Sequence, residues 1–259
     1  MHELHYSEEV RQALDNQQPI VGLETAVVTH GLPYPINIEL AQAMENLIRE
    51  EGAVPATVGV LGGKAQVGMN PTDIQLLAQD RDVIKVSRRD FSRAAVKKLN
   101  GGTTVAGTIT ALHQAGIQVF ATGGIGGVHR NAPYDVSADL YTMAHTPVVV
   151  VCAGAKSILD LPATLETLET LSVPVVGYQT STFPAFYARS SGLPVTAQVE
   201  EPEDAAILAR AHWAMGVNSA VLLAVPAPLE DALPDKAMSE AVNQALKDGP
   251  SWRKIDGLS

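Results

Sequence analysis

The sequence has little cysteine, few aromatic residues and no block of basic residues. Its one cysteine, Cys152, cannot form an internal disulfide, so a disulfide-stapled secreted domain is excluded and a reducing cytoplasm is the expected location. No run of Lys and Arg exceeds two residues, and the net charge is −10. This balance disfavours a nucleic-acid partner but leaves open a local basic pocket for a small phosphate.

Long apolar runs are also missing. The longest apolar stretches are far too short to cross a bilayer, and the start, MHELHYSEEVRQAL, lacks the basic-then-apolar order of a signal peptide. The chain is nevertheless 46% hydrophobic over 259 residues, which is enough for a sizeable core. We therefore expect a soluble cytoplasmic protein with no membrane partner.

Short β-branched runs alternate with helical patterns along the chain. This alternation predicts an α/β fold with a mostly parallel central sheet. No linker, low-complexity segment or repeat interrupts it, so we expect a single domain over residues 1–259. The expected strands cover 19–24, 56–63, 82–87, 118–124, 147–154, 174–179 and 219–225. The expected helices cover 37–52, 103–116, 157–171 and 201–216.

Polar and glycine-rich residues collect where expected strands end. In open parallel sheets, ligands bind outside the carboxyl ends of the strands. Five clusters follow this rule and are the candidates for a functional site: GLETAVVTHGLPYP (22–35), IKVSRRD (84–90), GGIGGVHRNAPYDVSADL (123–140), CAGAKS (152–157) and GYQTSTFPAFY (177–187).

Two charged residues lie in expected strands. Glu24 ends the first strand, where partial desolvation favours its protonated form and suits it to exchange a proton near neutral pH. Alternatively, the carboxylate of Glu24 caps the N-terminus of a helix or forms a salt bridge to an arginine. Lys85 lies between Ile84 and Val86, and a lysine in a buried strand needs a partner for its charge. It is either a clamp for phosphate or carboxylate, or an edge-strand lysine that points into water.

The third cluster offers contacts for an anion or a metal. GGIGGVHR places flexible backbone N–H groups beside His129. The segment is either a cradle that binds an anion or a tight turn. In YDVSADL, Asp135, Ser137 and Asp139 would share one face of an extended segment. Two carboxylates on one face fit a hard divalent cation. His129 is then either a further ligand or a structural hydrogen-bond donor. The alternative is an Asp-rich turn followed by a capped helix.

Lys156 follows the small residues CAGA, which leave room for a ligand, and precedes a helix expected to begin at Ser157. The positive end of that helix dipole would favour a neutral amine, which can attack a carbonyl carbon to form an imine. The alternative is an anion binder at a helix N-terminus. Cys152, at the end of VVVVC, fits core packing better than a nucleophile, because no Cys–His spacing accompanies it.

Seven motifs together resemble one known family. They are LETAVVTHGLPYP, VSRRD, GGTTVAGT, GGIGGVHR, DVSADL, VCAGAKSILDLPATLETLET and VPVVGYQTSTFPAFYARSSGLPV. They run through most of residues 20–200 in the family's order, and they are similar to the motifs of pseudouridine-5′-phosphate glycosidases, also called the indigoidine synthase A-like family. A constellation of this length is far more specific than any single glycine motif.

The resemblance implies a three-layer α/β/α sandwich, usually a homotrimer, that reversibly converts pseudouridine 5′-phosphate to uracil and ribose 5-phosphate. It also implies that Glu24 is the proton donor and that Lys156 is the nucleophile, which forms a Schiff base with C1′ of the ring-opened ribose. Asp135 corresponds to the aspartate that binds Mn²⁺. The other positions implied to lie at the substrate are Lys85, Val105, His129, Ser137, Ala138 and Asp139.

This family chemistry suits a C–C glycosidic bond. Such a bond has no heteroatom leaving group to protonate, so ordinary two-carboxylate glycosidase chemistry serves it poorly. An imine at C1′ supplies an electron sink next to the bond that breaks, and the uracil carbon then takes a proton. The expected roles of Glu24 and Lys156 are therefore complementary.

Two departures from the family pattern leave other functions open. The usual N-P-x-P reads VPAP here, with Val225 at the asparagine position, and the usual C-terminal segment with TPF has no counterpart in the 259 residues. One alternative function is a C-ribosylating synthase that joins ribose 5-phosphate to another aromatic acceptor. The other is a non-catalytic homologue that only binds the ligand.

Overall fold

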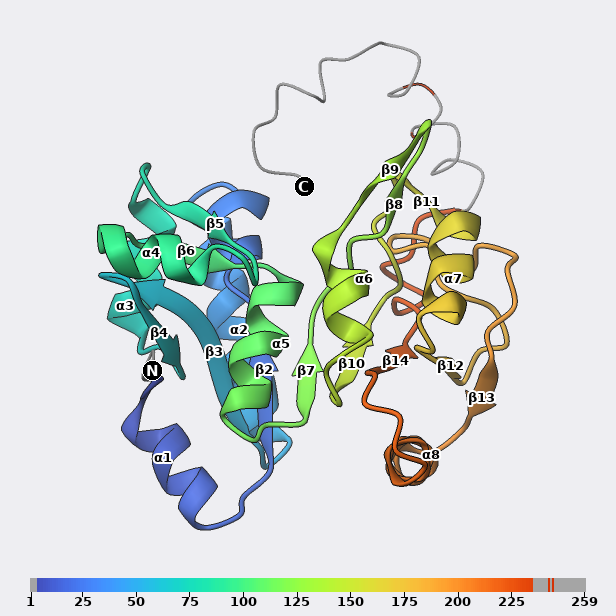
Figure 1. The fold of residues 1–259 in the computed structure, drawn as a ribbon, viewed down its shortest axis with the longest axis horizontal. Coiled ribbons are helices and arrows are strands. Elements are labelled where there is room, and N and C mark those ends of the chain that lie inside the picture. Colours follow the sequence, from blue (N-terminus) through green and yellow to red (C-terminus); the bar gives the residue numbers. More distant parts are fainter. Residues whose placement is uncertain (1–3, 235–241, 243, 245–259) are drawn as a thin grey trace. The chain divides into compact units, whose positions relative to one another are not determined.

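The computed structural model describes residues 4–234, 242 and 244. These residues form two compact units, one ending at Ala121 and the other beginning at Thr122 (Figure 1). The expected α/β class with mostly parallel strand pairing is confirmed, whereas one domain over residues 1–259 stays a prediction. None of the helices in the described part of the chain is long and apolar enough to cross a membrane.

The first unit alternates short strands with helices, as the sequence predicts. Its strands are β1 (His5–Tyr6), β2 (Ile20–Leu23), β3 (Val54–Leu61), β4 (Lys64–Val67), β5 (Ile84–Val86), β6 (Gly101–Thr103) and β7 (Val119–Ala121). Its α-helices are α1 (Glu8–Asp15), α2 (Ile36–Glu50), α3 (Pro71–Gln79), α4 (Phe91–Lys97) and α5 (Val105–Gln114). A π-helix, η1 (Val27–Gly31), follows β2.

Strand β3 is the centre of this unit's sheet. β4 runs antiparallel along one edge of β3. On the other edge, β2 pairs in parallel, with Leu23 opposite Thr57. β6 pairs antiparallel on that same edge, with Gly102 opposite Gly59. Because β2 and β6 run toward each other along one edge, their carboxyl ends meet beside Val58.

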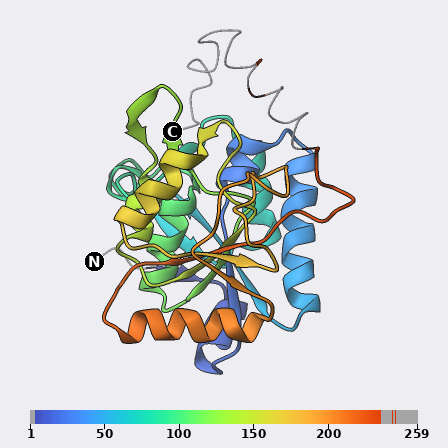
Figure 2. The ribbon, with the colours of Figure 1, turned by 90° about the vertical axis from the view of Figure 1, so that its right-hand side faces the viewer.

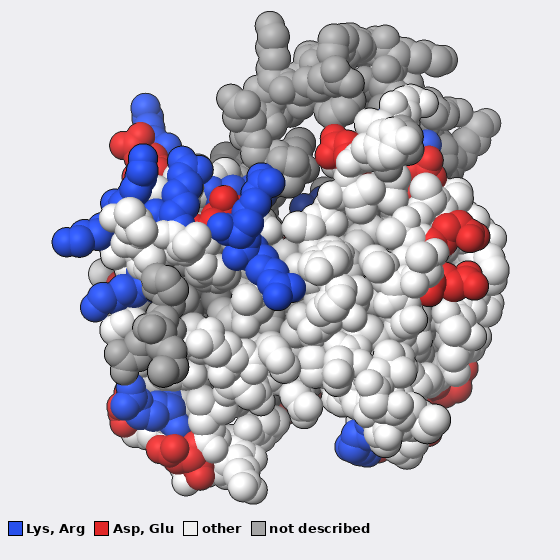
Figure 3. All heavy atoms as spheres, in the orientation of Figure 1, with Lys and Arg blue, Asp and Glu red and all other residues white. Residues whose placement is uncertain are grey.

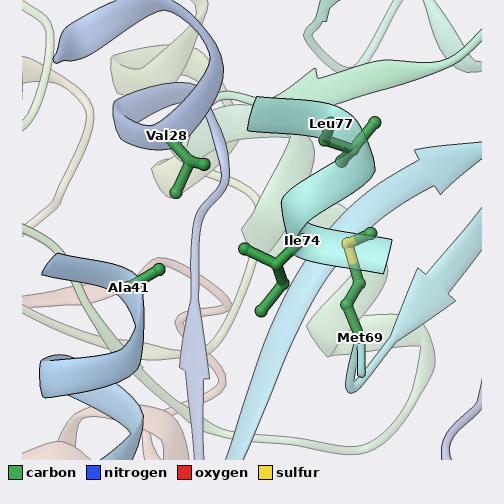
Figure 4. Close-up of a cluster of buried hydrophobic side chains, with 5 residues drawn as sticks. All are labelled: Val28, Ala41, Met69, Ile74 and Leu77. Carbon is green, nitrogen blue, oxygen red and sulfur yellow. The ribbon is translucent and has the colours of Figure 1, made fainter. Parts of the chain in front are cut away.

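Helices cover both faces of the sheet in the first unit. Successive residues of β3 point to opposite faces. Thr57 donates a hydrogen bond to Glu45 of α2 at 2.5 Å, whereas Val60 packs with Ala94 of α4. Figure 2 shows α2 along its length. The cluster that η1, α2 and α3 bury is drawn in Figure 4 and consists of Val28, Ala41, Met69, Ile74 and Leu77.

The second unit has a parallel sheet and a smaller antiparallel one. The parallel sheet has the order β10 (Val149–Cys152), β14 (Val221–Ala224), β12 (Val175–Tyr178) and β13 (Ala197–Val199). Helix α8 (Pro202–Ala214) packs on it through Ala205 and Ala209. The antiparallel sheet has the order β11 (Leu159–Asp160), β8 (Val128–His129) and β9 (Ala132–Val136). Two further helices are α6 (Ala138–Met143) and α7 (Leu161–Thr170).

Every strand and helix expected from periodicity is present, with ends shifted by a few residues. The largest shift is at the start of the helix expected over 157–171, because α7 begins only at Leu161. Its N-cap is Asp160, whose carboxylate accepts a hydrogen bond from the N–H of Ala163 at 3.1 Å. The elements that the sequence did not predict are mostly short, and two or three residues are too few to display a period.

Gly154 is required by the close approach of two loops in the second unit. Its φ is +98°, and a Cβ atom there would lie 2.1 Å from the carbonyl oxygen of Pro184. Its own carbonyl accepts a hydrogen bond from the N–H of Ile125 at 3.0 Å. Any side chain at this position would therefore push apart backbone segments that other contacts hold together.

Substitution Gly154→Ala should lower the free energy of unfolding by about 2–4 kcal/mol, because overpacking against backbone adds to the strain of a positive φ. Gly192→Ala is the matched control, since Gly192 has a φ of +75° but no atom within 4 Å of its Cβ position. This control should cost only about 1–2 kcal/mol. Urea unfolding of the three proteins measures both losses, and equal losses would contradict the close contact.

Candidate active site

Two buried threonine hydroxyls hold the carboxyl ends of β2 and β6 together in the first unit. Thr25 Oγ1 and Thr103 Oγ1 each donate to the carbonyl oxygen of Val58 at 2.7 Å. Thr25 Oγ1 also accepts from the backbone N–H of Thr103 at 2.9 Å. Glu24 directly precedes Thr25, so this network fixes the backbone beside the predicted proton donor.

Lys85 and Val105 lie on the two segments next to β6, close to where β6 meets the end of β2. Lys85 is opposite Gly102 in the pairing of β5 with β6, and Val105 begins α5 directly after β6. β5 is an edge strand, as one reading of the sequence had it, but Lys85 is half-buried and does not lie fully in water. The fold thus brings the three predicted residues of this unit, Glu24, Lys85 and Val105, to the strand ends that meet at Val58.

The π-helix η1 adds a histidine that the sequence reasoning missed. His30 Nδ1 lies 2.6 Å from Thr29 Oγ1. Burial and the nearby Lys85 ammonium lower the pKa of His30, so that its imidazole is neutral at pH 7. The histidine stands in the THGLPYP part of the first cluster, and π-helical turns often occur at functional sites. That local geometry was not visible in the sequence.

In the second unit, Lys156 lies in the loop between β10 and β11. Its backbone N–H donates to the carbonyl of Ile125 at 3.1 Å, and the N–H of Ile125 donates to the carbonyl of Gly154 at 3.0 Å. The CAGAKS and GGIGG loops therefore pair like short parallel strands, through Ile125 and Ala155. This pairing holds the backbone of the predicted nucleophile, whose side chain is half-buried.

The start of α7 corrects the argument made for Lys156 from the sequence. Ser157 does not begin a helix, and its hydroxyl instead donates to the carbonyl of Ala185 at 3.0 Å. Because the field of a helix dipole falls off within the first turn, α7, which begins at Leu161, does not act on Lys156 as expected. Both the dipole argument for a neutral amine and the alternative of an anion binder at a helix N-terminus are therefore wrong.

Ser137 and Asp139 approach Gly126 and do not share an extended face with Asp135. Ser137 is the N-cap of α6, and its Oγ accepts from the N–H of Asp139 at 3.2 Å. The buried carboxylate of Asp139 accepts from the N–H of Gly126 at 2.9 Å. A Cβ at Gly126 would lie 2.3 Å from Ser137 Oγ, so the approach needs glycine. The capped helix of the alternative reading is present, with Ala138 as its exposed first residue, whereas Asp135 lies in strand β9 and not in a turn.

Asp135 and His129 face each other across the hairpin of β8 and β9. Asp135 Oδ2 lies 4.0 Å from His129 Nδ1, and the side chain of Asp135 is 49% exposed. Within residues 4–234, 242 and 244, no group of three or more His, Cys, Asp and Glu is placed to hold a metal ion. The donors present fit an open site, in which one carboxylate binds a hard cation and water or phosphate oxygens complete the shell.

Three further residues, Cys152, Val225 and Phe186, lie at or contact the end of β10 and the loop that carries Lys156. Burial raises the pKa of the Cys152 thiol to about 12, so this cysteine is a core residue and not a nucleophile. Val225 follows β14 and donates its N–H to the carbonyl of Cys152 at 2.9 Å. Phe186 packs against Gly124, where a Cβ would lie 2.5 Å from Phe186 Cδ2. The divergent C-terminal residues, 251–259, lie outside the described residues.

Each unit therefore collects one set of the predicted residues. In the first unit, a carboxylate and an ammonium lie on segments that meet at Val58. In the second unit, the backbone of the GGIGGVHR segment contacts Lys156 on one side and Ser137 and Asp139 on the other. The sets contain a proton donor or acceptor, a primary amine, and N–H and ammonium groups that suit a phosphate.

Comparison with known proteins identifies relatives of this chain. It is 55% identical to a pseudouridine-5′-phosphate glycosidase of Roseiflexus sp., over 90% of this chain and 75% of that protein. It is 48% identical to one of Caldanaerobacter subterraneus subsp. tengcongensis, over 94% of this chain and 81% of that protein.

Two solved structures share the fold. The prealnumycin C-glycosynthase AlnA, in complex with ribulose 5-phosphate, has a TM-score of 0.88 at 39% identity and covers 98% of this chain and 85% of its own. An indigoidine synthase A-like protein of Thermotoga maritima has a TM-score of 0.86 at 34% identity, and the match covers 93% of this chain and 80% of that protein. The model of the family described as indigoidine synthase A like protein matches residues 9–257. This chain belongs to the indigoidine synthase A-like family.

Proposed function

We propose that this chain is an enzyme that reversibly cleaves the C–C glycosidic bond of pseudouridine 5′-phosphate, giving uracil and ribose 5-phosphate. One observation carries the proposal: Glu24 and Lys156 each follow the carboxyl end of a parallel strand, and hydrogen bonds hold the backbone at both positions. Relatives that are 48% and 55% identical bear the name of this activity, which supports it further.

Lys156 and Glu24 divide the proposed chemistry. Neutral Lys156 Nζ bonds to C1′ of the ribose as the C1′–O4′ bond breaks, and a proton passes from this nitrogen to O4′, which becomes a hydroxyl. The C1′–C5 bond then breaks, its electron pair passes to C5 of uracil, which takes a proton from Glu24, and the nitrogen lone pair forms the C1′=N bond of a Schiff base. Water hydrolyses this imine, which releases ribose 5-phosphate and restores Lys156.

The remaining residues bind the substrate in this proposal. Lys85 offers its ammonium group to the substrate's phosphate. Ser137 is half-buried at the start of α6, next to the exposed Ala138. Because Asp139 accepts from the N–H of Gly126, it also fixes the glycine loop against α6. The further substrate contacts are assigned to Val105 and His129.

A divalent cation, Mn²⁺, is proposed to bind at Asp135. The half-exposed carboxylate, with the His129 ring 4.0 Å away, supports an open site completed by water or by the substrate's phosphate oxygens. When bound, the cation supplies positive charge that offsets the charge of the phosphate. Asp135 holds it, and His129 orients that carboxylate.

We also propose that the chain works in the cytoplasm as a homotrimer, which rests on the family resemblance. Exposed apolar side chains in the first unit support an interface between copies, because covering them removes apolar surface from water. They are Leu32, Tyr34, Ile36 and Leu47. Light scattering of the purified protein gives the number of copies, and a monomer would contradict this assignment.

A second candidate function is the C-ribosylation of another aromatic acceptor. The likeness to a C-glycosynthase, at 39% identity and a TM-score of 0.88, favours it. Incubation with ribose 5-phosphate and either uracil or an aromatic acceptor, read by mass spectrometry, separates the two functions. A non-catalytic homologue would be stabilised against heat by ribose 5-phosphate but would form neither product.

Substitution Lys156→Ala should abolish uracil release, because no other lysine lies in the CAGAKS loop. With the unmodified chain, borohydride should trap the imine and add one ribose-phosphate mass to the peptide that contains Lys156. Glu24→Gln keeps the nucleophile, so the trapped adduct should still form from ribose 5-phosphate while uracil release falls by about 10²–10⁴-fold. Normal turnover in Lys156→Ala, or an adduct on Lys85, would contradict the assigned roles.

Removal of divalent cations should abolish uracil release, and added Mn²⁺ should restore it, because Asp135 is proposed to hold a cation that offsets the phosphate charge. Asp135→Asn should raise the Mn²⁺ concentration needed for half-maximal rate. Full activity of a rigorously metal-free preparation would show that the cation is not needed.

A further inference from the structure

The basic residues of this acidic chain are concentrated in one segment, residues 81–98. This basic segment holds seven of the 18 Lys and Arg residues and two of the 28 Asp and Glu residues, so its net charge is +5. The other 11 basic and 26 acidic residues give the rest of the chain a net charge of −15. Figure 3 shows Lys and Arg side chains gathered over the side of the first unit where α4 lies.

The basic segment is held firmly against the sheet. Ala94 of α4 is fully buried and packs with Val60 of β3. The turn between β3 and β4 lies directly against the helix, since a Cβ at Gly63 would come within 2.6 Å of the carbonyl oxygen of Ala94. The charges on α4 therefore keep a fixed place relative to β3.

Arg93 and Lys97 lie on the exposed side of α4. They are four residues apart, which places them on one face of the helix. Among the described residues, neither takes part in a salt bridge. Because no salt bridge in the described part of the chain pairs these two exposed side chains, their charges face the solvent.

The basic segment also contains Lys85, the proposed phosphate contact. A tight turn joins β5 to α4, in which the N–H of Ser87 donates to Asp90 Oδ2 at 3.0 Å and the N–H of Asp90 donates to the Ser87 carbonyl at 2.9 Å. Chain length alone keeps the Cα of Arg88 within about 11 Å of that of Lys85. This separation compares with a Debye length of about 8 Å at physiological ionic strength and about 30 Å at 0.01 M.

We propose that the basic segment steers the phosphorylated substrate electrostatically toward Lys85. The inference rests on the proposed function, because it takes a phosphorylated ribose as the ligand. A phosphate monoester carries about −1.5 to −2 charges at pH 7. The acidic remainder of the chain repels such an anion, whereas a cluster of fixed cations raises its local concentration and its association rate.

The test neutralises charges of the segment that lie away from Lys85. The double variant Arg93→Gln/Lys97→Gln should lower kcat/KM for pseudouridine 5′-phosphate about three- to fivefold at 0.01 M ionic strength, but less than about twofold at 0.5 M, with kcat unchanged. The matched control is Arg11→Gln/Arg210→Gln, which removes two exposed charges outside the segment and should leave kcat/KM unchanged. Lys85→Ala gives the contrast, because a lost direct contact lowers kcat/KM at both ionic strengths.

Two results would overturn the steering. One is an unchanged kcat/KM for Arg93→Gln/Lys97→Gln at 0.01 M, and the other is an equal loss at both ionic strengths, which indicates direct contact. If the unmodified chain shows no turnover, the proposed function fails instead. The same variants are then compared by calorimetry for ribose 5-phosphate binding at the two ionic strengths, where salt-sensitive weakening supports the steering. Absence of binding to the unmodified chain would overturn both.

Discussion

The carbonyl oxygen of Val58 organises the first unit, because it accepts hydrogen bonds from the hydroxyls of both Thr25 and Thr103. Without that carbonyl, the two buried hydroxyls would lose the backbone acceptor that they share. A buried hydrogen-bonding group that is left unsatisfied costs about 1–3 kcal/mol. With both bonds in place, the residue after β2 and the residues around β6 are fixed to one point of β3. Glu24, Lys85 and Val105 lie on or next to these segments. Their placement therefore depends on the hydrogen bonds that Thr25 and Thr103 donate to Val58 of β3.

The second unit reaches a similar result with glycine. Gly126 lets Ser137 and Asp139 come close to the backbone, and Gly154 lets two loops meet. The buried carboxylate of Asp139 is satisfied by a backbone N–H, so it ties α6 to the glycine loop that also pairs with the loop of Lys156. The glycines of this unit thus serve close packing. The anion cradle expected from their flexible backbone stays a prediction.

The sequence predicted the long elements and most of the candidate residues, because periodicity and strand-end position are local properties. It failed where the answer depends on non-local pairing. The antiparallel course of β6 along β3 has no local signal, and neither does the π-helix that carries His30. One error was avoidable, because Asp160 followed by Pro162 is a helix-start pattern. The cap at Ser137 was one of two readings of its segment, and the structure shows it. The roles of the site residues came from the family resemblance and not from periodicity.

The end-on meeting of β2 and β6 couples the lengths of two strands that lie about eighty positions apart in the chain. One edge of β3 is shared between them, and a residue added to either strand would collide with the end of the other. An insertion in β2 is thus tolerable only with a matching deletion in β6. Length variation among related chains should accordingly accumulate in the connecting loops, while these two strands change together.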